Sequence, residues 1–388
     1  MPRYAHPSKY FADDKDVADI LDAPKFNKKK LLNIALSRGL LLSDDLAVET
    51  LRDFMSRTPL SWPQLKELLG TIETPDSEEK LTTFRIESGV TLDVLQTTIA
   101  DVQAIRGECD KETYATRLVE GGVLVHITYS EVDQQMTRVL QRVRKEMDIL
   151  ITPIEGGYDF RYPANKRAQA IVDKIAASLP VPEGSEKPQK QTLDLSAVVD
   201  PSMRTEFFIL LMDSMNGFKR RNVIDLKMNR IPKEEEPDDD HDDDDDADDE
   251  ESAIKDAGEK MFGLVKRMSL TGEALLSSPQ FAQLKKDGFC ISRTVWESIE
   301  IQGAGRVFEL EALFKDGEGG KGFCYLVRGV HNHGDDGELE VTKKPLSLDD
   351  RKMMEQRIEE AAYAAMTAIR AKLETAASTA AKPSANGT

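Results

Sequence analysis

The chain has 388 residues, of which 40% are hydrophobic and 31% charged, a balance typical of folded domains rather than of disorder throughout. Its formal net charge of -18 is concentrated, because the run from Lys233 to Glu251 holds 15 of the 70 acidic residues and without these 15 the charge falls to -3. The three cysteines lie far apart, the N-terminus lacks the apolar core of a signal peptide, and no stretch approaches the roughly 18 apolar residues of a membrane span. We therefore expect a cytoplasmic protein without a disulfide framework or a membrane partner.

Residues 1–75 are predicted to form a helical module. The first helix is expected over Lys28–Leu36 and the second over Val48–Ser56. Ser61 is a favourable N-cap with Pro63 in the first turn, which predicts a third helix through Leu69.

Two stretches of this module, KKKLLNIALSRGL at 28–40 and ETLRDFMS at 49–56, together resemble the SAP motif, a small helix–extension–helix with an Arg-Gly-Leu junction. The resemblance covers residues 28–57 only, and the extension at 41–45 lacks the Gly-Lys pair that is common there. It implies binding to DNA through contacts with the backbone.

The residue types also favour binding to the DNA backbone. Three lysines at a helix N-terminus are unfavourable next to the positive end of the helix dipole, but together with the N–H groups of the helix end they can bind phosphate. The alternative is a helical hairpin whose lysines are merely solvated. The candidate DNA-binding residues of the module are Lys28, Lys29, Lys30 and Arg38.

The block at 76–180 is predicted to be a winged-helix-like α/β domain. A strand is expected over Leu81–Glu87, a helix over 90–106, and hairpins around Gly121-Gly122 and Gly156-Gly157. Apolar residues at helical spacing predict a further helix over 131–147, and the last helix of the block is expected over Asn165–Leu179.

A basic stripe is expected on the helix predicted over 131–147. Arg138, Arg142 and Lys145 recur at helical spacing and form an auxiliary candidate DNA-binding surface. Nearby acidic residues, such as Glu131 and Glu146, favour the alternative of an ordinary charged face. Lys219-Arg220-Arg221 is a third, weaker basic cluster.

After a linker at 181–200, an α+β domain is predicted over 201–346, interrupted by a disordered acidic loop at 233–252. A helix from Met203 precedes a strand over Asn222–Asn229, and a second helix is expected over 253–270. A long C-terminal helix at 347–375 and a disordered tail at 376–388 follow. The fold class is therefore α+β. A three-stranded antiparallel meander is predicted over Val295–Gln302, Arg306–Phe314 and Gly322–Arg328.

The acidic run has three interpretations. It is a solvated linker, or a nucleic-acid mimic that competes with DNA for the basic sites, or a docking site for a basic partner. Its spacing does not match an EF-hand loop.

Signals for an enzyme are weak. Asp225 and Lys227 form the Asp-x-Lys half of a nuclease signature without an evident second acid, and His331 and His333 lie in a loop rich in Gly and Asp. Glu309 and Glu311 alternate with apolar residues (Phe308, Leu310 and Ala312) and are interpreted as the solvent face of a strand. No cofactor is expected.

The favoured function is a non-enzymatic accessory or adaptor protein that binds double-stranded DNA and carries an autoinhibitory acidic loop. One alternative is a protein–protein interaction subunit of a bacterial defence or DNA-maintenance system, with a protein partner or homodimer formed through the C-terminal helix. The other is a metal-dependent nuclease that uses Asp225 and Lys227.

Overall fold

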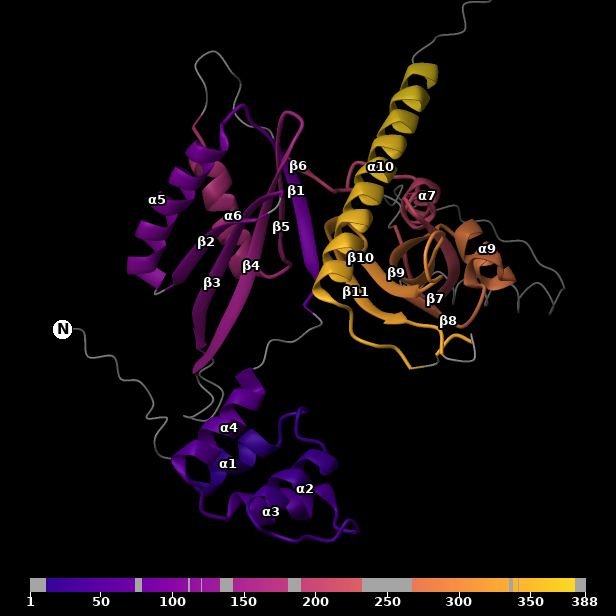
Figure 1. Ribbon diagram of the computed structural model, residues 1–388. Coiled ribbons are helices and arrows are strands. Elements are labelled where there is room, and N and C mark those ends of the chain that lie inside the picture. The colour runs from indigo at the N-terminus through magenta and orange to yellow at the C-terminus, as the bar shows by residue number, and fades with distance from the viewer. Residues whose placement is uncertain are drawn as a thin grey trace, which may run out of the picture. The chain divides into compact units, whose positions relative to one another are not determined.

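The structure is a computed structural model, in which the chain forms two compact units of mixed α+β character (Figure 1). The first unit comprises Met1–Ser77, Val90–Pro153 and Ala170–Glu183, and the second comprises the remaining segments. Nine α helices and eleven strands fall within the described part of the chain. The structure describes residues 12–73, 79–110, 112–119, 121–132, 142–180, 190–231, 267–334, 338–340 and 342–380.

The helical module at the N-terminus has a core of its own. Buried side chains from all four helices meet there, among them Ile20, Leu31, Leu51 and Leu65, together with Phe26 from the segment between α1 and α2. The three predicted helices are confirmed. An additional first helix begins at a capping box in which Asp13 accepts a hydrogen bond from the backbone of Asp16. The helices are α1 (Asp14–Leu21), α2 (Lys28–Ser37), α3 (Val48–Ser56) and α4 (Trp62–Glu73).

The rest of the first unit is a three-stranded antiparallel sheet, β2-β3-β4, with helix α5 and most of α6. The turn between β2 and β3 depends on two glycines. Gly121 has a φ of 88°, and a Cβ on Gly122 would lie 2.2 Å from the Ile151 carbonyl oxygen. The elements are α5 (Leu92–Asp110), β2 (Thr113–Val119), β3 (Gly122–Val132), β4 (Arg142–Ile154) and α6 (Lys166–Ser178).

The prediction of a helix over 131–147 is wrong. Residues 131–132 end β3, and β4 begins at Arg142, with Val132 paired to Arg142 and Ile127 to Met147. The apolar residues match helical spacing, but the alternation of buried Met147, Ile149 and Ile151 continues along the same strand, and pairing with β3 outweighs the local pattern. The helix on which the winged-helix-like interpretation depended is therefore a strand wherever the chain is described. Residues 133–141 lie outside the described residues.

In the second unit the strands are antiparallel, in the order β5-β1-β11-β10-β9-β7-β8, and β6 also pairs with β1. The predicted meander is confirmed as β9, β10 and β11, although β9 begins earlier, at Phe289. The strands are β1 (Leu81–Glu87), β5 (Gly157–Pro163), β6 (Lys190–Thr192), β7 (Phe218–Arg230), β8 (Arg267–Thr271), β9 (Phe289–Glu300), β10 (Val307–Asp316) and β11 (Lys321–His331).

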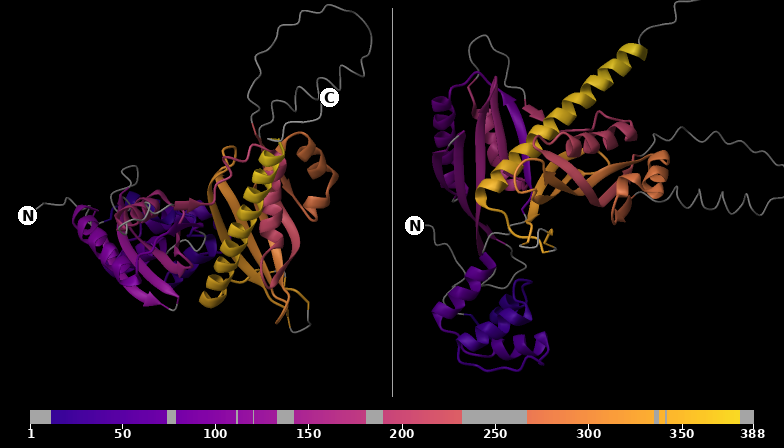
Figure 2. Two further views of the ribbon diagram at one scale, coloured as in Figure 1. Left: turned by 90° about the horizontal axis from the view of Figure 1, so that it is seen from above. Right: turned by 45° about the vertical axis from the view of Figure 1, so that its right-hand side comes forward.

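Helices α7 (Pro201–Asp213) and α10 (Leu348–Ala380) cover one face of this sheet (Figure 2). Ser347 caps α10, because its hydroxyl accepts a hydrogen bond from the Asp350 backbone at 3.1 Å. The core between sheet and helices includes Phe207, Trp296, Phe308, Tyr325 and Ile358. A short 3₁₀ turn, η1 (Leu275–Ser277), and helix α9 (Pro279–Lys286) follow β8.

Three predictions in the C-terminal half concern segments that are only partly described. The helix expected over 253–270 is wrong at its end, because residues 267–270 lie in β8 and pair with β7; residues 253–266 lie outside the described residues. The acidic run at 233–251 also lies outside them, between Arg230 and Arg267, and Arg267 pairs with Asn229. The tail predicted from residue 376 is helical up to Ala380, and residues 381–388 are outside the described part.

Candidate nucleic-acid interface

The first turn of α2 presents three lysines. Asn27 caps the helix by accepting a hydrogen bond from the Lys30 backbone at 3.0 Å, which fixes Lys28, Lys29 and Lys30 at its N-terminus. The Lys30 ammonium lies 5.5 Å from the centroid of the buried Phe26 ring. None of the three forms an ion pair with any residue that the structure describes. Their positive charges are therefore available to an anion beside the unsatisfied N–H groups of the helix end.

Arg38 follows the other end of α2. Its backbone N–H caps the helix by donating to the Ala35 carbonyl, the next N–H, of Gly39, donates to the Leu36 carbonyl, and the Arg38 side chain is half-buried. Within the described residues, the Nη1 atom of Arg38 is buried without a hydrogen-bond partner. Burial lowers the pKa of Arg38, while the nearby Glu67 carboxylate acts in the opposite direction. Because a helix of 10 residues spans about 15 Å, Arg38 and the lysines form two contact points rather than one cluster.

The structure does not assemble the second candidate surface as a helical stripe. Arg138 lies outside the described residues, and Arg142 is the first residue of β4. Lys145 lies on β4, exposed, and forms an ion pair with Glu131 of β3. The expectation of one helix face carrying these residues is wrong, since the described ones belong to a strand.

The third basic cluster lies at the start of β7, and two of its members are neutralised by carboxylates. Arg220 forms an ion pair with Asp213 at 3.1 Å, and Arg221 forms one with Glu297 at 3.6 Å. This cluster offers less unbalanced charge than the first turn of α2.

The two residues of the nuclease alternative lie on β7, as expected, but an arginine occupies the position beside them. The Arg293 Nη1 atom lies 2.6 Å from Asp225, and its Nε atom lies 2.8 Å from Glu311 on β10. A guanidinium thus bridges the two carboxylates that would otherwise approach a metal ion together. Across the described residues, no group of three potential metal ligands occurs.

Of the two histidines predicted to lie in a loop, His331 is the last residue of β11 and His333 follows the strand. His331 Nδ1 lies 3.0 Å from the Glu340 carbonyl and His333 Nε2 lies 3.1 Å from the Gly305 carbonyl. These contacts connect both rings to neighbouring backbone.

Glu309 and Glu311 lie on the sheet face away from α7 and α10, as their alternation predicts, but they are not solvated. The side chain of Glu311 is only 3% exposed and contacts Lys80 and Arg293 at 2.9 and 2.8 Å. Arg328 contacts both glutamates, at 2.9 and 3.7 Å. Burial acts to raise the pKa of Glu311, but hydrogen bonds from Arg293 and Lys80 outweigh it and lower that pKa. The alternation in the sequence predicts on which face of the sheet the two glutamates lie, but it does not predict the ion pairs that they form there.

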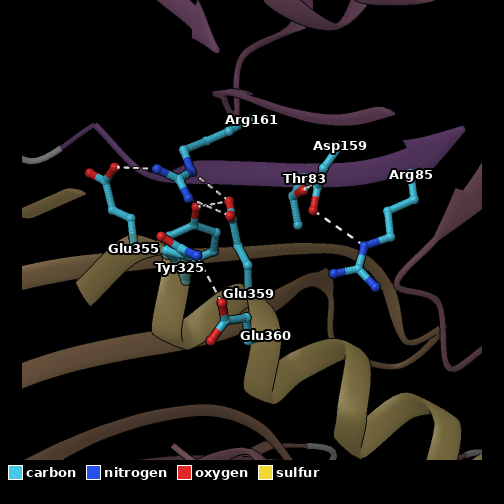
Figure 3. A network of polar contacts seen from close by, with 9 residues as sticks. Thr83, Arg85, Asp159, Arg161, Tyr325, Glu355, Glu359 and Glu360 are labelled. Carbon is cyan, nitrogen blue, oxygen red and sulfur yellow. Dashed lines mark hydrogen bonds and ion pairs between the residues drawn. The ribbon is translucent and has the colours of Figure 1, made fainter. Parts of the chain in front are cut away.

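On the opposite face, a second ion cluster joins α10 to the sheet (Figure 3). Arg161 of β5 donates from Nε to Glu359 at 2.7 Å and from Nη1 to Glu355 at 3.1 Å. The buried Tyr325 hydroxyl donates to Glu359 as well. Burial raises the pKa of both glutamates, although the charge of Arg161 acts against it. The sequence pattern gave no signal for this cluster, because its members come from three distant segments.

The same cluster continues along β1 and β5. Asp159 accepts a hydrogen bond from Thr83 at 2.5 Å and lies 3.3 Å from the Nε atom of Arg85. The guanidinium of Arg85 lies 3.6 Å from the ring centroid of Tyr363 on α10. These contacts connect α10 to β1 and β5.

No protein-family model matches the sequence, and no curated protein matches it either. Among the helices that the structure describes, none has the length and apolar character that crossing a membrane requires.

Proposed function

We propose that this protein is a non-enzymatic DNA-binding accessory protein of the cytoplasm, and that the first turn of α2 contacts the DNA backbone. The observation that carries the proposal is the row Lys28, Lys29 and Lys30 at a capped helix N-terminus, without an ion-pair partner in the described residues. Helix N-termini and lysines both bind phosphate, and backbone contacts need no base-specific groups. The SAP-like sequence at 28–57 supports the same proposal.

Arg38 extends the proposed contact. Its side chain is half-buried and lies about 15 Å along the helix from the lysines. A DNA strand that follows α2 could contact both ends of the helix. In this proposal the acidic run competes with DNA for the cations, at a tethered concentration on the order of mM.

The test is binding to a short double-stranded DNA across a salt series, for the intact chain and for a chain that lacks residues 234–251. Four phosphate contacts predict that log affinity falls with log salt with a slope of about -3.6. The deletion is expected to bind more tightly. An unchanged affinity after deletion would remove the competing role of the acidic run.

The site is located by two matched triple variants. Changing Lys28, Lys29 and Lys30 to alanine is expected to reduce the slope by about 2.7, because three counterion-releasing contacts are lost. Changing the same residues to arginine keeps the charge and is expected to keep the slope. If the alanine variant binds like the wild type, or if no variant binds DNA at low salt, the proposal fails.

A second candidate function is a protein-interaction subunit, and one feature of α10 favours it. Among the residues of α10 whose burial the structure describes, 348–375, the last fully buried one is Ile369, and the helix continues to Ala380. A partner or a second copy of the chain could pack on this extension. Sedimentation of the full chain would show self-association, which truncation after residue 372 would abolish.

A further inference from the structure

One face of the second unit's sheet, the face turned away from α7 and α10, is dominated by charged side chains. We call it the charged face. By register, Lys227 of β7 lies beside Arg293 of β9, and Asp225 and Glu311 both lie beside Val295 on the next row. It comprises six cations, Lys80, Arg221, Lys227, Arg293, Arg328 and Lys343, and four carboxylates, Asp225, Glu297, Glu309 and Glu311.

The two buried glutamates lie beneath the cations that pair with them, whereas Asp225 and its partner Arg293 are about equally exposed. The side chains of Glu311 and Glu309 are 3% and 12% exposed, whereas Lys343 and Arg328 are 37% and 33% exposed. Glu311 is ionised at neutral pH, because its cationic neighbours lower its pKa. The face therefore has two more positive than negative charges, and Lys227, Arg328 and Lys343 are among the cations that reach its outer surface.

Several donors on the charged face remain available. Arg293 uses Nε and Nη1 for its two carboxylates, and Arg328 uses Nη1 and Nε. In each case Nη2 takes no part in these ion pairs. Lys227 is exposed and has no ion-pair partner among the described residues. The buried glutamates thus hold Arg328 in position while its side chain, which is 33% exposed, can contact a ligand.

The spacing of these cations suits an extended anion. Lys227 and Arg293 lie on neighbouring strands, about 4.8 Å apart across the sheet. Arg328 lies two strands beyond Arg293, about 10 Å across the sheet, and also four residues along β11 from Cys324, the residue in line with Arg293. The apolar side chains of this face, Val295 and Leu326, are buried beneath the ion pairs. The face therefore lacks the exposed aromatic anchors of a protein–protein interface.

We infer that the charged face is a second contact surface for the sugar-phosphate backbone of DNA, with Lys227, Arg293, Arg328 and Lys343 as phosphate contacts. The inference rests on the proposed function for the choice of DNA as the ligand. Its site is independent of the α2 site, because the charged face lies in the other unit of the chain. Charge complementarity selects the ligand, since arginine and lysine held in a row bind phosphates without reading bases.

The experiment measures binding of the full chain to the same double-stranded DNA across a salt series. The double variant Lys227→Gln with Lys343→Gln removes two cations from the charged face, and Arg328 still pairs with Glu309. The matched control, Lys285→Gln with Lys286→Gln, removes two exposed lysines from the last turn of α9. The slope is expected to fall by about 1.8 in the first variant and to stay unchanged in the control.

The outcomes separate this inference from the proposed function. If only the alanine variant of Lys28–Lys30 lowers the slope, the charged face is not a DNA contact. If only the charged-face variant lowers the slope, the inference holds, and the first turn of α2 is not a DNA contact. If the charged-face variant and the α9 control change the slope equally, or if no DNA binding occurs, the inference is overturned. A charged-face variant that instead loses a protein partner would assign the face to that partner.

Discussion

The two ion clusters of the second unit differ in how many cations surround each carboxylate. Glu311 contacts three, Lys80, Arg293 and Arg328. Glu355 and Glu359 share Arg161, with the carboxylate of Asp159 nearby. Burial disfavours ionisation in both places, but only the first has enough opposing charge to lower the pKa. The local ratio of charges therefore decides whether an ionised carboxylate stabilises or destabilises the fold.

Replacing Glu355 with glutamine is expected to stabilise the protein at neutral pH. Its pKa is raised by burial, so wild-type stability from this group is present below the unfolded pKa of about 4.3 and is lost as pH rises through the folded pKa. Glutamine can still accept a hydrogen bond from Arg161, and because it does not ionise, the variant does not lose this stability as pH rises. The measurement is the melting temperature from about pH 4 to pH 8, where the gain should appear only as the pH rises.

The matched change is Glu311→Gln, for which the expected effect on stability at neutral pH has the opposite sign. Its pKa is lowered, so its stabilising effect is present above about 4.3 and is lost as pH falls through the folded pKa. This variant should be less stable than the wild type at neutral pH by about 1–3 kcal/mol. Curves of the same sign for both variants would contradict this account of the two clusters.

Among the elements, those with a strong local signal could be predicted from the sequence. Helix α3 has the expected bounds because the apolar residues Leu51 and Met55 are one turn apart. Strand β1 has the expected bounds because the apolar residues Phe84 and Ile86 alternate with charged residues. The segment 131–147 could not be predicted, because spacing compatible with a helix there is overridden by pairing between β3 and β4. The basic cluster of α2 could be predicted as well, because its three lysines are consecutive in the sequence. The charged face was not, because cross-strand neighbours such as Lys227 and Arg293 are far apart in the sequence.

Two glycines allow the strength of individual elements to be tested. Gly70 lies exposed in α4 with open space around its Cβ position, so Gly70→Ala should stabilise the protein by about 0.5–1 kcal/mol. Gly122→Ala is the contrasting change, because the new Cβ would lie 2.2 Å from the Ile151 oxygen and push β3 from β4. Denaturant midpoints measure both effects. Equal midpoints for the two variants would contradict the described turn.

At the scale of the whole molecule, two hydrophobic cores are separate. One lies within the helical module and contains Phe26, and the other lies between the second unit's sheet and its helices and contains Phe308. Each core buries the apolar surface that stabilises its own part of the chain. We therefore expect the helical module to unfold independently of the second unit.

Alanine substitutions at the two phenylalanines test this independence. Both side chains are fully buried, so each change should cost about 3–5 kcal/mol in its own core. Phe26→Ala should lower only the calorimetric transition of the helical module, and Phe308→Ala only that of the second unit. A single transition lowered by both changes would show that the cores unfold together.

The pairing of β7 with β8 has a consequence for how this protein tolerates insertions. Arg267 lies beside Asn229, so the hairpin brings together the two ends of the segment that carries the acidic run. Doubling the length of such a connection costs only about 0.6 kcal/mol in closure entropy, because its ends are already joined by strand pairing. The number of charges there can therefore change over generations almost without affecting the fold, and the hairpin is a natural position for inserting a reporter domain.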